Sequence, residues 1–171
     1  DGHDFLGDVA RRQVAGALLG TNHHKHIPQG LVAVEVASPR VAFGQLAGSY
    51  RRRFQLPVVC VAGSNGKTTT KEILRLACNA LGRTHASAAS YNNHWGVPLS
   101  LASLPRDAEY GIFEVGMNHF GELRNLVGFV RPHVALITTI APAHLEFFGN
   151  CESIADAKSE IFEGLLPGGA G

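Results

Sequence analysis

The 171-residue sequence has few cysteines, no long apolar run and no excess of charge of either sign. Its three cysteines, Cys60, Cys78 and Cys151, are odd in number and widely spaced, which argues against a disulfide framework and for a reduced compartment. No apolar run reaches the ~18 residues that a membrane-spanning helix needs. Fifteen basic and fourteen acidic residues nearly cancel, so no basic surface for nucleic acid is expected. We therefore expect a cytoplasmic protein with no membrane span and no nucleic-acid partner.

What the sequence does contain is an alternation of strand-like and helix-like patterns. Apolar runs that indicate strands lie at 30–36, 58–62, 110–115 and 133–140. Patterns that indicate helices lie at 9–19, 39–54, 68–81, 121–130 and 153–166. The last of these helices is expected to begin at Ser153 as its N-cap. The alternation predicts an α/β fold with a mostly parallel sheet flanked by helices.

The stretch VVCVAGSNGKTTTKEIL, residues 58–74, places a glycine-bearing loop where a strand passes into a helix. Backbone N–H groups in such a loop, together with the partial positive charge of the helix N-terminus, bind phosphate. Lys67 would bring a charge to the β- and γ-phosphates, and the Thr68 hydroxyl would ligate Mg²⁺. The expected nucleotide-binding residues are Gly63, Ser64, Asn65, Gly66, Lys67, Thr68 and Thr69.

The loop departs from the strict P-loop pattern. A glycine is expected five residues before Gly66, but Val61 is found there, and Gly63 lies only three residues before it. We interpret the loop as a shorter variant of the P-loop. The alternative is a plain glycine turn before a helix that happens to begin with Lys-Thr.

A domain boundary is expected where a helical pattern ends and Pro57 opens the next strand. Residues 1–52 would be the end of a smaller α/β domain, and residues 53–171 the first part of a P-loop ATPase domain. The chain ends in LLPGGAG, a helix followed by a turn. We therefore expect a fragment of a longer protein.

Two candidate metal-binding side chains follow strands that are expected to be parallel neighbours. Glu114 lies at the end of the run 110–115, and His144 comes shortly after the run 133–140. The carboxyl ends of parallel strands meet at the edge where a phosphate loop lies. Glu114 would bind Mg²⁺ or order a water there, unless it is a solvated residue at a strand end. His144 is either a ligand or a structural histidine.

Lys158 breaks the pattern of the last helix. At about 100° per residue it shares one face with apolar residues such as Ile154, Ile161 and Leu165. A desolvated ammonium is costly, and burial lowers the pKa of lysine. Either the stem is packed and the charged head reaches water, or the amine is neutral and serves chemistry, for example by accepting CO₂ as a carbamate.

Five stretches, in chain order, resemble motifs of the Mur ligase family. They are AGSNGKTTTKE (62–72), SYNNHWGVPLSL (90–101), FEVGMNHFGEL (113–123), TTIAPAHLEFFGN (138–150) and IADAKSEIFEGL (154–165). The resemblance implies an amide ligase that transfers the γ-phosphate of ATP to a peptide carboxylate, so that an amine can attack the acyl phosphate. The second and third stretches are most similar to the member that joins D-alanyl-D-alanine to UDP-N-acetylmuramoyl-tripeptide in peptidoglycan precursor synthesis.

The resemblance also implies roles for particular residues. Lys67 would neutralise the phosphates, and the metal ligands for Mg²⁺ would be Thr68, Glu114, His144 and Lys158, the last as a carbamate. Asn92 and Asn93 both match asparagines near the phosphate site, and Asn93 is our candidate for ATP binding. Which of the two faces the site stays open.

The resemblance leaves alternatives. The family's C-terminal domain is not part of the 171 residues, so this chain alone is expected to be inactive, and we expect a monomer. A sister ligase of the family or a folylpolyglutamate synthetase would share most of these motifs. A P-loop nucleotide-binding module without ligase activity would explain residues 58–82 but not Glu114, His144 or Lys158.

Overall fold

The computed structural model describes residues 2–21, 27–142 and 145–171. The chain divides into two compact units, Asp1–Gln45 and Leu46–Gly171, so the division falls within helix α2 (Pro39–Arg51). It therefore lies before the boundary that the sequence predicts between residues 52 and 53. No helix among the described residues is long and apolar enough to cross a membrane.

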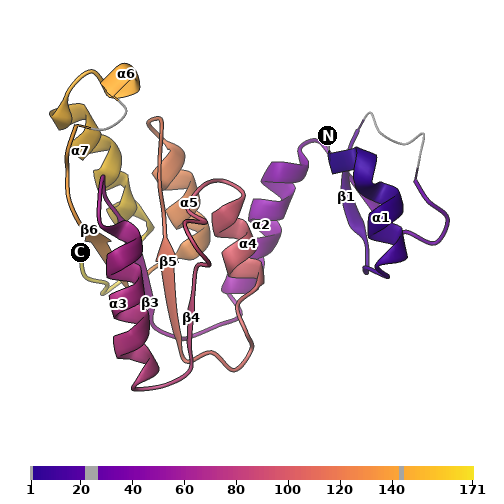
Figure 1. The fold of residues 1–171 in the computed structure, drawn as a ribbon, viewed down its shortest axis with the longest axis horizontal. Coiled ribbons are helices and arrows are strands. Elements are labelled where there is room, and N and C mark those ends of the chain that lie inside the picture. The colour runs from indigo at the N-terminus through magenta and orange to yellow at the C-terminus, as the bar shows by residue number, and fades with distance from the viewer. Residues whose placement is uncertain (1, 22–26, 143–144) are drawn as a thin grey trace. The chain divides into compact units, whose positions relative to one another are not determined.

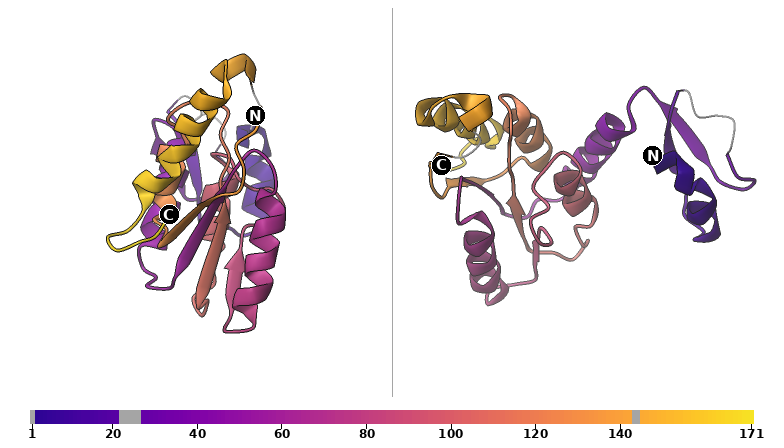
Figure 2. Two further views of the ribbon diagram at one scale, coloured as in Figure 1. Left: turned by 90° about the vertical axis from the view of Figure 1, so that its left-hand side faces the viewer. Right: turned by 45° about the horizontal axis from the view of Figure 1, so that its top comes forward.

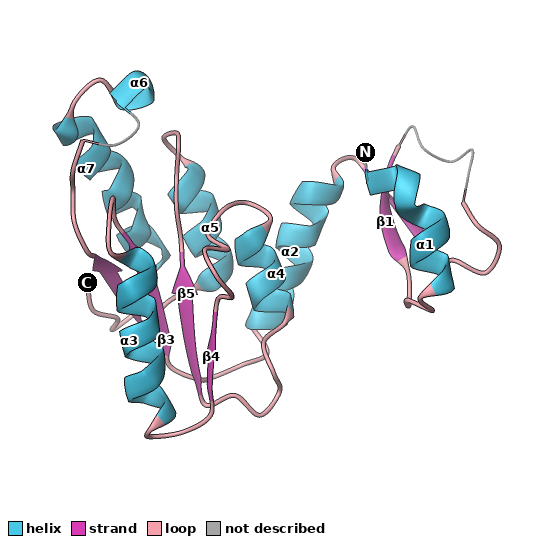
Figure 3. Cartoon of the chain, in the orientation of Figure 1, coloured by secondary structure: helices cyan, strands magenta, loops and turns pink. Residues whose placement is uncertain are grey.

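The N-terminal unit contains a short parallel strand pair beside a short helix (Figure 3). Its elements are η1 (Gly2–Phe5), α1 (Leu6–Arg11), β1 (Ala17–Gly20) and β2 (Ala33–Val36). Leu6, Leu19 and Leu31 form its small core. The predicted helix over 9–19 is wrong, because α1 ends at Arg11 and residues 17–20 pair with β2. That pairing joins segments distant in sequence, which a helical pattern read in one window does not reveal.

The second unit is a four-stranded parallel sheet with the strand order β4-β5-β3-β6, which confirms the predicted α/β class (Figure 1). Its strands are β3 (Val58–Ala62), β4 (Thr84–Ala86), β5 (Tyr110–Glu114) and β6 (Val134–Ile137). Its helices are α3 (Lys67–Asn79), α4 (Gly96–Ala102), α5 (Glu122–Val130), α6 (Leu145–Phe148), α7 (Cys151–Ser159) and the 3-10 helix η3 (Glu160–Gly164).

Three of these elements, β4, α4 and α6, are absent from the sequence-based prediction, and the last predicted helix differs in detail. Residues 153–166 are not one helix, since α7 starts earlier and passes into η3. The N-cap of α7 is Asn150, whose Oδ1 accepts a hydrogen bond of 2.8 Å from the backbone N–H of Ser153. The prediction that Ser153 is the N-cap is therefore wrong.

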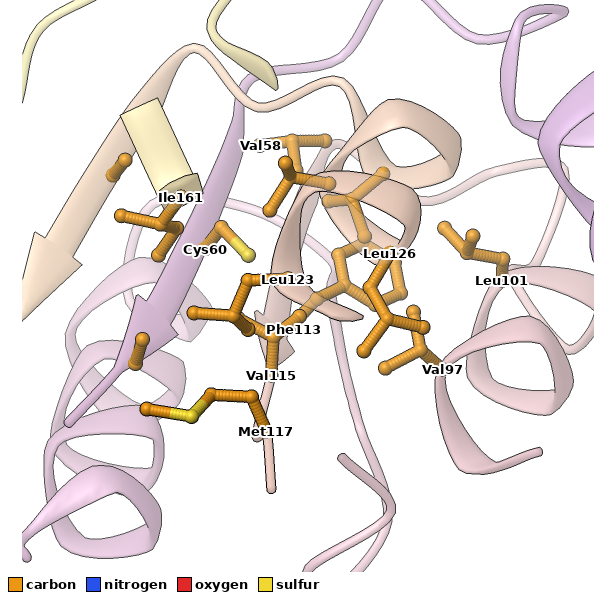
Figure 4. Close-up of a cluster of buried hydrophobic side chains, with 14 of the residues drawn as sticks. Val58, Cys60, Val97, Leu101, Phe113, Val115, Met117, Leu123, Leu126 and Ile161 are labelled. Carbon is orange, nitrogen blue, oxygen red and sulfur yellow. The ribbon is translucent and has the colours of Figure 1, made fainter. Parts of the chain in front are cut away.

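Helices cover both faces of the sheet: α3 lies on one side, and α5, α7 and η3 lie on the other (Figure 2). Side chains on β3 alternate between these sides, and Val58, Cys60 and Ala62 belong to the main core cluster (Figure 4). On β5, the side chain of Phe113 belongs to the same core cluster. Because successive residues of a strand point to opposite faces, Glu114 points to the side of α3. This alternation places a carboxylate beside the first turn of that helix.

Candidate phosphate and metal site

The loop between β3 and α3 is fastened to the segment that follows β6. The Ser64 hydroxyl donates to the Ala141 carbonyl and accepts from the Ala141 N–H, both at 3.1 Å. The Thr138 hydroxyl donates to the Asn65 carbonyl at 2.5 Å. At Gly63 the backbone φ is +146°, and a Cβ would lie 1.9 Å from the Thr138 Oγ1. Only glycine fits this position, so the shorter loop is built for a close approach of two backbone segments.

Lys67 begins α3 and bends back over the loop. Its ammonium donates to the Gly63 carbonyl at 2.7 Å and more weakly to the Ser64 carbonyl at 3.4 Å. The first turn of α3 contains no acidic residue, so its partial positive charge is not cancelled within the helix. This loop combines a lysine side chain with the N-terminus of a helix. Such an arrangement favours the binding of an anion such as phosphate.

Glu114 is the centre of the polar contacts at this edge of the sheet. It is only 1% exposed, yet each carboxylate oxygen has a donor: the Thr68 hydroxyl at 2.9 Å and the Asn92 amide at 2.7 Å. The Ser90 hydroxyl lies 3.4 Å from the Thr68 hydroxyl. Hydroxyl and carboxylate oxygens are the ligands that Mg²⁺ prefers, and it uses only one or two carboxylates besides water and phosphate. The chemistry of these residues fits a magnesium ion.

The two neighbouring asparagines do different things. Asn92 contacts Glu114, whereas the Oδ1 of Asn93 accepts from the N–H groups of Trp95 and Gly96 at 3.0 and 2.9 Å. These bonds place Asn93 at the N-terminal end of α4. A Cβ on Gly96 would lie 2.6 Å from the Tyr91 backbone, so this turn also requires glycine. ATP binding by Asn93 stays a prediction, and Asn92 is the one whose amide reaches the carboxylate.

Lys158 lies on α7 and is only 5% exposed. Burial, and secondarily the nearby positive charge of Lys67, lower its pKa to about 8. Among the described residues its ammonium has no hydrogen-bond or ion-pair acceptor. The low exposure favours a partly neutral amine over a charged head extended into water.

The predicted site residues thus come together in part. Lys67, Thr68 and Glu114 lie at one edge of the sheet, and Lys158 is close enough to Lys67 for their charges to repel. His144 lies outside the described residues. Within the described ranges no group of three histidine, cysteine or acidic side chains could hold a metal. A metal here would therefore rely on Thr68, Glu114 and further oxygen ligands.

Lys71, which is completely buried on α3, was not predicted from the sequence as a residue of this site. A signal was present, because Lys71 follows Lys67 by four residues and so lies on the same side of the helix. Ser87, whose hydroxyl accepts from the backbone N–H of Glu114 at 3.2 Å, was not predicted either. Ser87 stands just after β4, a strand too short to be predicted.

Comparison with known proteins gives a consistent picture. The family described as the Mur ligase middle domain matches residues 61–171. The chain is 40% identical over 169 residues to UDP-N-acetylmuramoyl-tripeptide–D-alanyl-D-alanine ligase of Escherichia coli (strain K12). This match covers 99% of the chain and 36% of the relative, so the chain spans about a third of that relative's length.

Solved structures agree with the sequence relatives. A crystal structure of MurF from Acinetobacter baumannii has a TM-score of 0.89 and 38% identity, and the match covers 99% of this chain and 37% of that one. The MurF ligase from Thermotoga maritima in complex with ADP has a TM-score of 0.84 and 30% identity. That match covers 96% of this chain and 38% of the other.

Proposed function

The chain belongs to the Mur ligase family, and from that premise we propose that it is the nucleotide-phosphate part of an ATP-dependent amide ligase. The full-length protein would join D-alanyl-D-alanine to UDP-N-acetylmuramoyl-tripeptide in peptidoglycan precursor synthesis, as a cytoplasmic monomer. The observation that carries the proposal is the contact between Thr68 and Glu114 beside the phosphate loop. A nucleotide-binding module without ligase chemistry would also hold Mg²⁺ with a hydroxyl and a carboxylate. The buried Lys158, whose charge is close enough to Lys67 to lower its pKa, is the feature that favours the ligase over such a module.

The proposed chemistry has to bring two anions together, the triphosphate and a peptide carboxylate. Lys67 and the N-terminus of α3 would hold the phosphates and reduce their negative charge. Magnesium ions, when bound, would stabilise charge on the transferring phosphoryl group. Thr68 and Glu114 would hold one ion. Lys158 as a carbamate, with His144, would hold a second.

The attack of the carboxylate on the γ-phosphorus forms a carbon–oxygen–phosphorus link and releases ADP. The amine of the second substrate then attacks the acyl carbon, an amide bond forms, and inorganic phosphate leaves with the electron pair of the broken bond, while the amine gives up one proton to phosphate or solvent. Excluding water matters at this stage, since an acyl phosphate hydrolyses easily. The groups that would bind the amine are expected in the remaining two thirds of the protein. Residues 1–52 are proposed to belong to the domain that binds the UDP substrate.

A substrate panel on the full-length protein tests the proposal. ATP-dependent phosphate release is measured with UDP-N-acetylmuramoyl-tripeptide plus D-alanyl-D-alanine, with shorter UDP-muramoyl acceptors plus single amino acids, and with a folate plus glutamate. We expect release, and an amide product by mass spectrometry, only with the first pair. Turnover with another pair would assign the protein to a sister ligase. Nucleotide binding without turnover of any pair would support the alternative, a nucleotide-binding module without ligase activity.

A further inference from the structure

Lys71 has the largest side chain among the fully buried residues of the described chain. Its ammonium donates to the backbone carbonyls of Ser87 and Ala89 at 2.8 and 2.6 Å, and it lies 3.2 Å from a carboxylate oxygen of Glu72. An ammonium has three N–H donors, so these three acceptors use them all. Lys71 therefore has neither exposure nor a free donor with which to touch a nucleotide.

The two carbonyls belong to the segment 87–92, the first part of the connection between β4 and α4. Ala89 has a φ of +43°, a left-handed conformation that is strained for any residue with a Cβ. Strain of this kind persists only where surrounding contacts impose it. Here the contacts are charge-assisted hydrogen bonds from a buried cation, which are stronger than neutral ones.

The same segment supplies most of the contacts to the metal-binding pair. The Ser87 hydroxyl accepts from the backbone N–H of Glu114, the Ser90 hydroxyl lies beside that of Thr68, and the Asn92 amide donates to the Glu114 carboxylate. The backbone of Asn92 also accepts from the Gly116 N–H at 2.7 Å. A shift of this turn would move three side chains relative to Thr68 and Glu114 together.

We propose that Lys71 is a positioning residue: it holds the strained turn 87–92 so that Ser90 and Asn92 orient Thr68 and Glu114 for a magnesium–nucleotide complex. The inference rests on the proposed function, because it assumes that Thr68 and Glu114 bind the ion. It goes further by assigning a task to a residue that cannot reach the substrate. Lys71 acts indirectly, through its hydrogen bonds to the backbone carbonyls of Ser87 and Ala89.

The test compares Lys71→Met with the control Glu72→Gln in the full-length protein. Met keeps the unbranched apolar stem of lysine, one atom shorter, but removes the donors, whereas Gln keeps an oxygen near Lys71 and does not touch the turn. We measure the Mg²⁺ concentration that gives half-maximal ADP affinity, and the amide hydrogen exchange of peptides covering 87–95. For Lys71→Met we expect at least a tenfold higher Mg²⁺ requirement and at least tenfold faster exchange in 87–95. For Glu72→Gln we expect changes below threefold.

A second substitution separates positioning from general stability. In Lys71→Met/Ala89→Gly, glycine adopts the left-handed conformation without strain, so part of the Mg²⁺ affinity should return. If Lys71→Met does not fold, Lys71→Arg replaces it, since arginine keeps the charge but presents its donors in a planar fork. A raised Mg²⁺ requirement is again expected. A Mg²⁺ requirement and turn exchange equal to wild type, in whichever variant folds, would overturn the proposal.

These readouts distinguish the inference from the proposed function. ADP binding and hydrogen exchange need no acceptor substrate. If the wild type binds ADP with Mg²⁺ but ligates no pair in the substrate panel, the proposed function fails while Lys71 keeps its role.

Discussion

The Thr68 hydroxyl donates a 2.9 Å hydrogen bond to the Glu114 carboxylate, across 46 positions of sequence. The contact exists because α3 begins, and β5 ends, at the same edge of a parallel sheet. Removing the charge of Glu114 tests what the contact is for. In the full-length protein we expect Glu114→Gln to lower kcat by about 10²-fold or more, since charge stabilisation at a transferring phosphoryl is a large catalytic term. Phosphate release under saturating ATP measures it.

The matched control is Glu109→Gln. Glu109 lies just before β5, at the opposite end of the same strand, and accepts a bond from the Arg83 N–H. The Glu109→Gln variant should have a kcat within about twofold of the wild-type value. Equal losses in both variants would mean that Glu114 acts through stability alone.

Substitutions of Asn92 and Asn93 should affect different quantities, the Mg²⁺ requirement in one case and the free energy of unfolding in the other. Asn92→Ala removes a donor to Glu114, so we expect a raised Mg²⁺ requirement with little loss of stability. Asn93→Ala removes the acceptor for two N–H groups just before and at the start of α4, so we expect a loss of about 1 kcal/mol of unfolding free energy, the usual size for a lost hydrogen bond. Urea unfolding and Mg²⁺ titration of both variants check this. The reverse pattern would mean that Asn93, as the sequence predicted, is the residue at the nucleotide.

Lys158 should be reactive near neutral pH. With its pKa near 8, about half of the side chains are neutral at pH 8, against about one in 300 for an ordinary lysine. Carbamate formation with CO₂ needs the neutral amine, so a ¹³C-bicarbonate NMR signal should grow as the pH rises through about 8. The signal should vanish in Lys158→Met.

A shorter substitution of Lys158 has a kinetic consequence. In Lys158→Ala the activity should fall by at least about 10²-fold, and a short carboxylate such as acetate should restore part of it by replacing the lost oxygen ligands. Acetate should not stimulate the wild type. Undiminished activity would show that the amine takes no part in the chemistry.

Gly63 should be intolerant of a methyl group. In Gly63→Ala the new Cβ would meet the Thr138 hydroxyl and the φ of +146° would be strained, so we expect a loss of roughly 1–3 kcal/mol in stability and a weaker nucleotide affinity. Gly128→Ala is the control, because Gly128 lies inside α5 with no heavy atom within 4 Å of a built Cβ. It should stabilise the protein by up to about 1 kcal/mol. Thermal unfolding and ADP titration give both quantities.

His133 should make stability fall in mild acid. Its Nδ1 accepts a 3.1 Å bond from the backbone N–H of Val58, and its pKa is lowered by burial and then by the charge of Arg51. The unfolded chain therefore takes up this proton at a higher pH than the folded chain does. The contribution is complete above about pH 6.5 and is lost as the pH falls towards the folded pKa.

His133→Asn isolates this effect, because the amide oxygen can replace Nδ1 as an acceptor but does not titrate. Urea unfolding at pH 7.5 and 5 should show a smaller loss of stability in His133→Asn than in the wild type. His85, whose pKa is also lowered by burial, remains in both proteins and cancels in the comparison. Identical pH slopes would rule out His133 as a contributor.

Local patterns were sufficient for much of this protein. The glycine loop between β3 and α3, the parallel sheet and the position of Glu114 at its edge follow from short stretches, because a strand alternates with period 2 and a loop of this kind needs glycine, lysine and a hydroxyl in fixed order. The misplaced charge of Lys158 was visible from helical spacing alone. Each of these signals lies within one element and its neighbours in sequence.

Only the tertiary structure determined the features that depend on contacts between segments distant in sequence. Residues 17–20 form a strand only because β2 pairs with them, although their own pattern favours a helix. Asn92 rather than Asn93 meets Glu114, because Asn93 is taken up at the start of α4. Lys71 looks like any lysine on a helix until the turn 87–92 closes over it. Burial and hydrogen-bond partners are set by which segments pack together, and no single stretch of sequence carries that information.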